Sequence, residues 1–277
     1  MWYNREKTSE VVPISRRELD VLRPIDDVFM KQMFEGDARF TEQVLRLIIG
    51  VPSLEVKSVS TQKALEMRAV NARSVILDVY ATDGDGVVYN IEVQRSDEGA
   101  VPQRARYHVG ALDVAGLCPG QDFSQLPQVF VIFITEHDVL GVDGGVYCFD
   151  RIDRKTGKAL EDGSHIIYVN GDYRGDDSIG RLVHDFLCHD PREMHLPFMA
   201  EKAGFLKSEP KGEARMNKAL EGYLKEYAQE YAQEYAKEQS RHSALRMIKM
   251  GKLSYEDIAI GLGMSADEVA SLAKGIM

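Results

Sequence analysis

Hydrophobic residues recur at helical spacing in three parts of the chain. Between residues 25 and 50, apolar side chains return every three or four positions, with an interruption near Gly36. This spacing predicts two consecutive helices, because one face of an α-helix repeats about every 3.6 residues. Residues 101–115 have the same periodicity, as do residues 178–206, where Pro191 marks a break between two helices.

Strand-like patterns lie between these helical segments. Residues 54–60 alternate between apolar and polar, and residues 75–95 contain two such runs around the turn-rich sequence Thr-Asp-Gly-Asp-Gly. Residues 128–135 form a continuous apolar run, which is typical of a strand covered on both faces. Two more short strands are expected at 146–150 and 165–169. Together these elements predict an α/β fold with helices on a mixed sheet.

The C-terminal quarter has a helical pattern but a different composition. Between Glu213 and Gln239, tyrosine and glutamate each recur every four residues, a period that winds slowly around a helix. We expect an exposed or self-associating helix there. The tyrosines concerned are Tyr223, Tyr227, Tyr231 and Tyr235.

The last segment, residues 247–275, predicts a helix, a turn and a second helix. Ser254 and Ser265 are suited to cap helix N-termini, and Glu268 follows Ser265 at the spacing of a capping box. Such a unit could read DNA, although few basic residues lie on its final helix.

Length and composition suit one globular core with an appendage. The chain has 277 residues, of which 44% are hydrophobic and 28% charged, as in folded domains rather than disordered or fibrous chains. We expect a loosely held N-terminal segment (1–20), a core domain (21–206) and a helical tail (207–277).

The net charge of −10 lies entirely in the core part of the chain. Residues 1–206 hold 23 basic and 33 acidic residues, whereas residues 207–277 hold 11 of each. An acidic balance argues against a protein that coats nucleic acid by neutralising phosphates. It leaves room for a local basic groove, or for carboxylates that work through bound cations.

Neither a membrane segment nor a secretory leader is expected. No apolar run approaches the roughly 20 residues of a membrane helix, and the N-terminus lacks the apolar centre of a signal peptide. The three cysteines are widely spaced and odd in number, so we expect reduced, mostly buried thiols and a cytoplasmic location. They are Cys118, Cys148 and Cys188.

Three polar side chains interrupt the otherwise apolar strands of residues 75–95: Asp78, Glu92 and Gln94. If residues 84–86 form the loop between the strands, the register places Asp78 directly opposite Glu92. Opposed residues of antiparallel strands share a face, with Cβ atoms about 5 Å apart. Alternation also puts Gln94 on the face of Glu92.

Two carboxylates held this closely repel one another unless a proton or a cation lies between them. Hard oxygen ligands suit Mg²⁺ or Mn²⁺, which keep water or phosphate oxygens as their other ligands. Two interpretations without a metal remain open: Asp78 and Glu92 are ordinary charges on a solvated sheet face, or they form a structural acidic pair.

The order Asp78, a turn, then Glu92-Val93-Gln94 resembles the PD-(D/E)XK nuclease motif in its variant form Asp…Glu-x-Gln, as in the recombination-promoting nuclease (Rpn) or transposase-associated family. The resemblance covers most of residues 24–275 and implies a restriction-endonuclease-like core, with helices flanking a mixed central sheet, and an all-helical tail. Flanking stretches that agree are Asp27 with Lys31 and Phe34, QRARYHVGALDVAGLCPGQDFSQLPQVFVIFIT, LVHDFLCHDPREM and the closing run of helices.

This resemblance implies a metal-dependent endonuclease that acts on DNA in recombination or mobile DNA. Asp78 and Glu92 would hold Mg²⁺ or Mn²⁺, with the backbone carbonyl of Val93 as a third ligand, and the metal would activate water. Gln94 stands where most such nucleases have lysine. An amide can orient water but carries no charge, so a catalytically weak protein that binds DNA or assembles is the alternative.

Accessory residues follow from the same resemblance. Asp27 would add an acidic ligand or orient a water, and Arg104, Arg106 and Tyr107 lie on the helix that would contact phosphate. The two arginines are two positions apart and do not share a helix face, so we expect at most one of them in the site.

Two further hypotheses concern other parts of the chain. His184 and Cys188 have the i, i+4 spacing of a zinc-ligand pair, and His189 and His195 lie nearby, but no second well-spaced pair completes a site. The tyrosine-rich helix could join two copies of the chain into a homo-oligomer, as a nuclease with one site per chain would need for double-strand breaks.

Overall fold

The computed structural model describes residues 16–65, 75–95 and 97–274. Its strands are β1 (Val56–Leu65), β2 (Val75–Asp83), β3 (Val88–Gln94), β4 (Val129–Thr135), β5 (Val146–Phe149) and β6 (Ser164–Val169). Its α-helices are α1 (Arg16–Asp20), α2 (Asp27–Phe34), α3 (Ala38–Ile49), α4 (Pro102–Gly116), α5 (Ser178–Leu187), α6 (Pro197–Ser208), α7 (Pro210–Met250), α8 (Tyr255–Leu262) and α9 (Ala266–Lys274).

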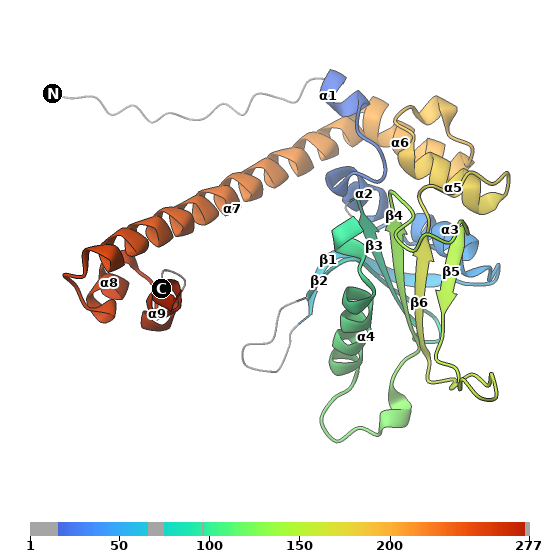
Figure 1. The fold of residues 1–277 in the computed structure, drawn as a ribbon. Helices are drawn as coiled ribbons and strands as arrows, with labels where there is room; N and C mark the ends of the chain where they lie inside the picture. The colour runs from blue at the N-terminus through green and yellow to red at the C-terminus, as the bar shows by residue number, and fades with distance from the viewer. Residues whose placement is uncertain (1–15, 66–74, 96, 275–277) are drawn as a thin grey trace. The chain divides into compact units, whose positions relative to one another are not determined.

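The six strands form one mixed sheet in the order β1-β2-β3-β4-β6-β5. β3, β4 and β6 are parallel to one another, and the other neighbours are antiparallel. The helix α4 connects β3 to β4 and lies in front of the sheet in Figure 1, whereas α3 lies behind it. The predicted α/β fold with helices on a mixed sheet is therefore confirmed.

Most predicted elements occur close to their expected bounds. The break near Gly36 separates α2 from α3, and the break near Pro191 separates α5 from α6. The first strand is longer than the predicted 54–60 and runs to Leu65, because it pairs along nearly the whole of β2. The main apolar cluster on the α4 side contains Val109 and Leu112 of α4 with Val131 and Phe133 of β4.

The hairpin between β2 and β3 has the predicted register. Val79 pairs with Ile91, and the Asp83 amide donates to the Val87 carbonyl at 3.2 Å, as expected for a loop at residues 84–86. Asp83 stabilises this loop by accepting the Val87 amide at 2.9 Å. Gly86 has φ 82, a left-handed conformation that glycine adopts without steric cost.

The chain divides into two compact units between Ala219 and Leu220, within α7. The first turns of α7 belong to the unit that contains the sheet, because Met216 is fully buried and Arg215 donates to Gln32 Oε1 at 2.6 Å. Of the N-terminal segment, residues 16–20 form α1, whose Leu19 is buried. Residues 1–15 lie outside the described residues.

The second unit contains the helix-turn-helix predicted for residues 247–275, up to Lys274. Ile258 of α8 and Val269 of α9 pack with Ala244 of α7 in a small apolar core. Ser265 accepts the Glu268 amide at 3.2 Å, and Glu268 accepts the Ser265 amide at 2.8 Å. This confirms the predicted capping box.

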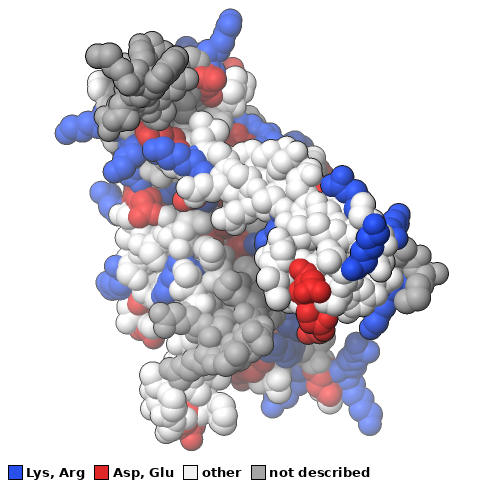
Figure 2. Space-filling model, turned by 90° about the vertical axis from the view of Figure 1, so that its left-hand side faces the viewer, with Lys and Arg blue, Asp and Glu red and all other residues white. Residues whose placement is uncertain are grey.

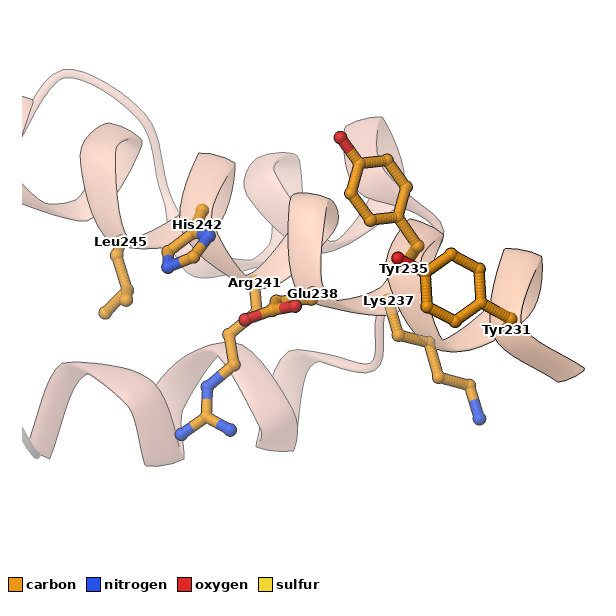
Figure 3. A pocket seen from close by; sticks show the side chains of 7 residues that line it. All are labelled: Tyr231, Tyr235, Lys237, Glu238, Arg241, His242 and Leu245. Carbon is orange, nitrogen blue, oxygen red and sulfur yellow. The ribbon is translucent and has the colours of Figure 1, made fainter.

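The tyrosine repeat of α7 faces solvent within this second unit. The four tyrosines are 39–61% exposed, and their rings stack in two pairs: Tyr223 with Tyr227 and Tyr231 with Tyr235. A surface pocket of about 640 Å³ adjoins the second pair; Figure 3 shows these two rings at one end and His242 and Leu245 at the other. The exposed helix expected from the sequence is therefore confirmed.

The cysteines are less buried than expected. Cys188 is buried, but Cys118 and Cys148 are exposed, so the prediction of mostly buried thiols is wrong for these two. All three are free thiols. Among the described residues, no helix has the uninterrupted apolar length that crossing a bilayer requires.

Candidate functional site

The acidic residues lie where the hairpin ladder of β2 and β3 ends. Backbone pairing between these strands extends from Thr82 and Val88 to Val79 and Ile91. Beyond that point β2 continues to pair with β1, and β3 continues to pair with β4. The two strands therefore separate at the next pair of positions, Asp78 and Glu92.

Where the backbone hydrogen bonds between β2 and β3 end, the carboxylates of Asp78 and Glu92 accept hydrogen bonds from backbone amides of the opposite strand. The Asp78 amide donates to Glu92 Oε1, and the Val93 amide donates to Asp78 Oδ2, each at 3.2 Å. These reciprocal bonds hold the two carboxylates on one side of the opened hairpin. The side chain of Glu92 is completely buried, so the interpretation of the pair as ordinary charges on a solvated face is wrong.

Burial and mutual repulsion make the Asp78 carboxyl hold its proton to a higher pH than usual, because they raise its pKa. Desolvation, the largest cause, and the neighbouring Glu92 carboxylate together raise the pKa of the Asp78 carboxyl from 3.8 to about 7. The hydrogen bond from the Val93 amide acts in the opposite direction but is outweighed. A cation placed between the two carboxylates would replace that proton, which is the property expected of a metal site.

Arg104 supplies positive charge to the site. Its Nη2 atom lies 3.0 Å from Glu92 Oε2, and its Nη1 atom donates to Gln94 Oε1 at 3.2 Å and to the Gly99 carbonyl at 3.0 Å. A Cβ atom at position 99 would lie 2.1 Å from Gln94 Oε1, so a side chain there would displace the Gln94 amide. The arginine, the amide and the buried carboxylate thus form one connected group.

Two residues of this group, Asn90 and His108, were not predicted from the sequence. His108 is almost fully buried; its Nε2 atom accepts from Arg104 Nε at 3.4 Å, and its Nδ1 atom lies 3.5 Å from Glu92 Oε1. Asn90 Nδ2 lies 3.0 Å from the same Nδ1 atom. The signals were present: Asn90 precedes Glu92 by two positions on one strand face, and His108 follows Arg104 by four on one helix face.

Gln62 of β1 is a third residue that the sequence did not reveal. Its Nε2 atom donates to Asp78 Oδ1 at 3.4 Å. Its backbone has φ 52, a left-handed conformation that costs a residue with a side chain on the order of 1 kcal/mol or more. The strain lies next to Asp78, where β2 and β3 separate.

The other predicted site residues are placed less centrally. Asp27 begins α2 with a half-exposed carboxylate that pairs with Lys31 at 2.9 Å, and its charge contributes to the raised pKa of Asp78. Arg106 is exposed on α4, away from the face that carries Arg104, and Tyr107 is exposed on the same helix. Of the two arginines, Arg104 alone contacts the acidic pair among the described contacts, in line with the expectation from helix geometry.

Loss of the arginine is expected to destabilise the fold. Arg104→Gln leaves the buried Glu92 carboxylate without its ion pair, and because the arginine is itself partly exposed we expect a loss of about 2 kcal/mol in the free energy of unfolding. Urea unfolding at pH 8 measures this difference. Arg106→Gln removes the same charge from an exposed position of α4 and is expected to change stability by less than about 0.5 kcal/mol. Equal losses of unfolding free energy in the two variants would contradict the assignment of Arg104 as the ion-pair partner of Glu92.

The histidine and cysteine cluster does not form a zinc site. His184 Nδ1 lies 3.0 Å from Asp185 Oδ1, and the Cys188 thiol donates to the Asp190 carbonyl at 3.2 Å. The rings of His184 and His195 lie against each other at a tilt of 38°, with centroids 4.2 Å apart. Within the described part of the chain, no group of three or more His, Cys, Asp or Glu side chains is arranged to hold a metal.

The acidic pair nevertheless suits a cation that needs few protein ligands. Asp78 and Glu92 offer hard oxygen atoms, and the Asn90 Oδ1 atom beside them is buried without a hydrogen-bond partner among the described residues. An unpaired buried acceptor costs free energy until a donor such as water reaches it. A pair of carboxylates fits Mg²⁺ or Mn²⁺, which keep waters as their other ligands, better than Zn²⁺, which takes three or four protein ligands.

Comparison with known proteins identifies the family. The family model described as PD-(D/E)XK nuclease family transposase matches residues 25–171, a range that contains the sheet from β1 to β6, the acidic pair and α4. Neither a search of curated proteins nor a search of solved structures gave a significant match. The match covers more than half of the chain and agrees with the mixed sheet and its flanking helices. The chain therefore belongs to the PD-(D/E)XK nuclease family transposases.

Proposed function

We propose that this protein is a divalent-metal-dependent DNA endonuclease that acts in recombination or on mobile DNA. The observation that carries the proposal is the buried pair of Asp78 and Glu92, cross-bonded where the hairpin opens, within the region matched by the nuclease family. Buried like charges are costly to maintain, so a fold that keeps them has a use for a cation at that point.

Each residue of the proposed site has a separate role. Asp78, Glu92 and the Val93 carbonyl would hold Mg²⁺ or Mn²⁺. When bound, such an ion lowers the pKa of water and stabilises negative charge on the scissile phosphate. The Asn90 Oδ1 atom, which has no hydrogen-bond partner among the described residues, would accept a hydrogen bond from a water and orient it. His108 contacts Asn90, Glu92 and Arg104, and thereby positions them.

Gln94 and Arg104 together replace the lysine of the common motif. The Gln94 carbonyl oxygen accepts from Arg104 Nη1, and the other terminal nitrogen of the guanidinium reaches Glu92. The positive charge therefore comes from α4 rather than from β3. Unlike lysine, arginine stays protonated, so it serves as an electrostatic partner and not as a base.

This arrangement predicts that restoring the lysine is harmful on its own. Gln94→Lys places an ammonium beside the Arg104 guanidinium, and we expect cleavage about tenfold slower because like charges at this distance repel. The double variant Gln94→Lys/Arg104→Gln is expected to recover most of the native rate. Initial rates of plasmid nicking measure both, with Gln94→Leu as a control for loss of the hydrogen bond alone. A single Gln94→Lys variant faster than the native enzyme would refute this replacement.

The proposed function is tested by incubating the native protein with supercoiled plasmid in Mg²⁺, in Mn²⁺ and in EDTA. Nicked or linear products in either metal, and none in EDTA, are expected. An absence of cleavage in both metals would overturn the enzyme assignment.

A second candidate function rests on the position of Arg104. Its guanidinium already neutralises Glu92 and binds Gln94, so it competes with a cation for the same carboxylate. This favours a protein of the nuclease fold that binds DNA or assembles but cleaves weakly. DNA binding without metal-dependent cleavage in the plasmid experiment would support this candidate.

We also propose that α7 joins two copies of the chain through its exposed tyrosines. Tyr227 and Tyr231 lie at the centre of the stripe and are 58% and 61% exposed, an unusual exposure for large aromatic side chains on one helix. Multi-angle light scattering of the native protein is expected to give a dimer. The double variant Tyr227→Lys/Tyr231→Lys should be monomeric, because the two charges oppose burial of the stripe.

The control for this experiment is Gln229→Lys/Gln233→Lys. It adds the same two charges to the same helix at exposed positions two residues farther along, and it should leave the dimer intact. Removal of residues 213–277 is a poorer test, because it also deletes the buried Met216 of the first unit. A native protein that is monomeric at micromolar concentration would disprove self-association through α7.

A further inference from the structure

A surface pocket at the start of α5 gathers cationic side chains outside the acidic site. Its volume is about 420 Å³. Against four basic side chains it has a single carboxylate, and it lies wholly within the unit that contains the sheet. The lining residues are Arg174, Gly175, Asp176, Gly180, Arg181, His184 and His195.

A tight turn brings the two arginines to the same pocket. A Cβ atom on Gly180 would lie 1.7 Å from the Gly175 carbonyl oxygen, so only glycine permits this approach. Asp177 caps α5 by accepting the Gly180 amide at 2.8 Å and also accepts the Tyr173 hydroxyl at 2.9 Å. These contacts fix the segment between Arg174 and Arg181.

The basic groups of the pocket are oriented but only weakly neutralised. Arg174 Nη1 donates to the Gly171 and Tyr173 carbonyls at 2.6 and 2.9 Å, which directs the guanidinium without cancelling its charge. Arg181 pairs with Asp176 at 3.5 Å, but that carboxylate is fully exposed, and such pairs contribute little.

The two histidines that line the pocket are held near each other by contacts with one buried carboxylate. Asp185 is fully buried and accepts the backbone amides of His195 and Leu196 at 2.8 Å each, while His184 Nδ1 lies 3.0 Å from it. One buried carboxylate thus joins α5 to the segment before α6. Both rings line the pocket.

The pocket lies on the same edge of the sheet as the acidic site. β3, β4 and β6 are parallel, so their C-terminal ends meet at one edge. The Glu136 amide donates to the Gln94 carbonyl at 3.0 Å, and Gly171 packs against the backbone of Glu136 so closely that a Cβ atom would lie 2.3 Å from its carbonyl oxygen. Arg174 in turn donates to Gly171. Three successive contacts therefore connect Gln94 to Arg174.

A local site of this kind is what an acidic nuclease needs. The chain carries a net charge of −10, and on the face drawn in Figure 2 the Lys and Arg side chains are scattered among Asp and Glu rather than gathered in one strip. DNA presents phosphates at regular intervals along each strand. A strand whose scissile phosphate lies at Glu92 carries further phosphates along the same edge.

We propose that this pocket binds a phosphate group of the DNA backbone away from the scissile bond, through the guanidinium groups of Arg181 and Arg174. The identity of the ligand as DNA rests on the proposed function. His184 and His195 also line the pocket and would contribute hydrogen bonds. Contacts to phosphate position the nucleic acid and carry no sequence information, so this site raises affinity for all sequences equally.

The test measures DNA binding by the full chain in EDTA. Fluorescence anisotropy of a labelled duplex gives the affinity over a range of salt concentrations. Arg181→Gln is expected to weaken binding about threefold to tenfold and to reduce the slope of log K against log salt by about 0.9, the value for one phosphate contact. Arg181 is exposed, so the substitution leaves the fold intact. Two duplexes of unrelated sequence should lose the same factor.

The matched control is Arg192→Gln. This arginine lies beyond the end of α5, is 88% exposed and is engaged by Asp190 at 2.5 Å, so its removal changes the net charge equally outside the pocket. The DNA affinity of the Arg192→Gln variant and its slope of log K against log salt should equal those of the native protein. Equal effects of the two substitutions, or no effect of Arg181→Gln, would overturn the pocket assignment and leave the nuclease assignment standing.

Further outcomes separate the ligands and the two proposals. Inorganic phosphate is titrated against the native chain while the ring signals of His184 and His195 are followed by NMR. The phosphate-induced shifts could be lost in Arg181→Gln while the DNA affinity of that variant stays native. This result would identify a site for free phosphate and would overturn the proposal that the pocket binds DNA. Because binding is measured without metal, a protein that binds DNA through Arg181 but does not cleave it retains the pocket and loses the nuclease function.

Discussion

Replacing either acid of the buried pair is expected to remove metal-dependent cleavage. Asp78→Asn and Glu92→Gln keep the size of the side chain but take away an anionic oxygen from a site proposed to hold Mg²⁺ with only two carboxylates. We expect the rate of plasmid nicking to fall by on the order of 10³-fold, equivalent to about 4 kcal/mol of transition-state stabilisation. The measurement is the initial nicking rate at saturating metal.

The control for this loss is Asp83→Asn. It removes the same charge from the same hairpin, where Asp83 stabilises the loop by accepting the amides of Asp85 and Val87 at 2.9 Å each. We expect it to lower the melting temperature while the nicking rate stays within about threefold of native. Cleavage that survives in Asp78→Asn and Glu92→Gln would rule out the acidic pair as the catalytic centre.

The same Asp78→Asn variant is expected to be more stable than the native protein in EDTA at pH 8. The pKa of Asp78 in the folded state is about 7 against an ordinary 3.8, first because of burial and then because of Glu92. Between these two values the folded state binds more protons than the unfolded state, so native stability falls as pH rises through this window. Asparagine is neutral throughout and escapes that loss.

We expect Asp78→Asn to raise the melting temperature at pH 8 by about 4–8 °C, or about 2 kcal/mol, and to leave it nearly unchanged at about pH 3 or below, where Asp78 is largely protonated in both states. Scanning calorimetry in EDTA at the two pH values measures this. Asp138→Asn should have the opposite effect: burial acts to raise the pKa of Asp138, but hydrogen bonds from the Leu140 amide and the Tyr147 hydroxyl outweigh it and lower the pKa. A lower melting temperature for Asp78→Asn at pH 8 would show that the pair is not under charge strain.

These two results together separate catalysis from folding. A variant that is more stable and far less active has lost a group kept for its function, whereas a variant that loses both has lost a structural group. Arg104→Gln belongs to the second kind, because it is expected to lower stability by leaving Glu92 unpaired.

The hairpin geometry was predictable because it depends on local chain properties. A short loop fixes the register of two strands, and strand alternation then decides which side chains share a face. Asp78 and Glu92 could therefore be placed opposite each other from the sequence alone, and the observed pairing of Val79 with Ile91 agrees. Helix geometry likewise indicated that Arg104 and Arg106 do not share a face, and Arg104 is the one that contacts Glu92.

Contacts between elements distant in sequence were not predictable in this way. Asn90 and His108 are 18 residues apart, and Gln62 precedes Asp78 by 16, so their proximity depends on how α4 and β1 pack against the sheet. The partner of Gln94 was missed for the same reason. The sequence predicted that its amide orients water but did not reveal that its carbonyl oxygen accepts from Arg104.

The histidines near α5 illustrate a different limit of sequence reasoning. Spacing on one helix made His184 and Cys188 look like a pair of metal ligands. The structure gives the thiol a backbone carbonyl as its partner and places the His184 ring against His195 instead. A spacing rule identifies side chains that share a helix face, but it cannot show what lies opposite that face.

The opening of the hairpin at Asp78 and Glu92 also gives the molecule a built-in reporter. The backbone amides of Asp78 and Val93 donate to carboxylate oxygens of the acidic pair instead of to a neighbouring strand. The chemical shifts of these two amide groups are therefore sensitive to the charge on the carboxylate oxygens. In a ¹⁵N-labelled sample, the two resonances should move together as the pair titrates or takes up a cation, so the state of the site can be read spectroscopically without any substrate.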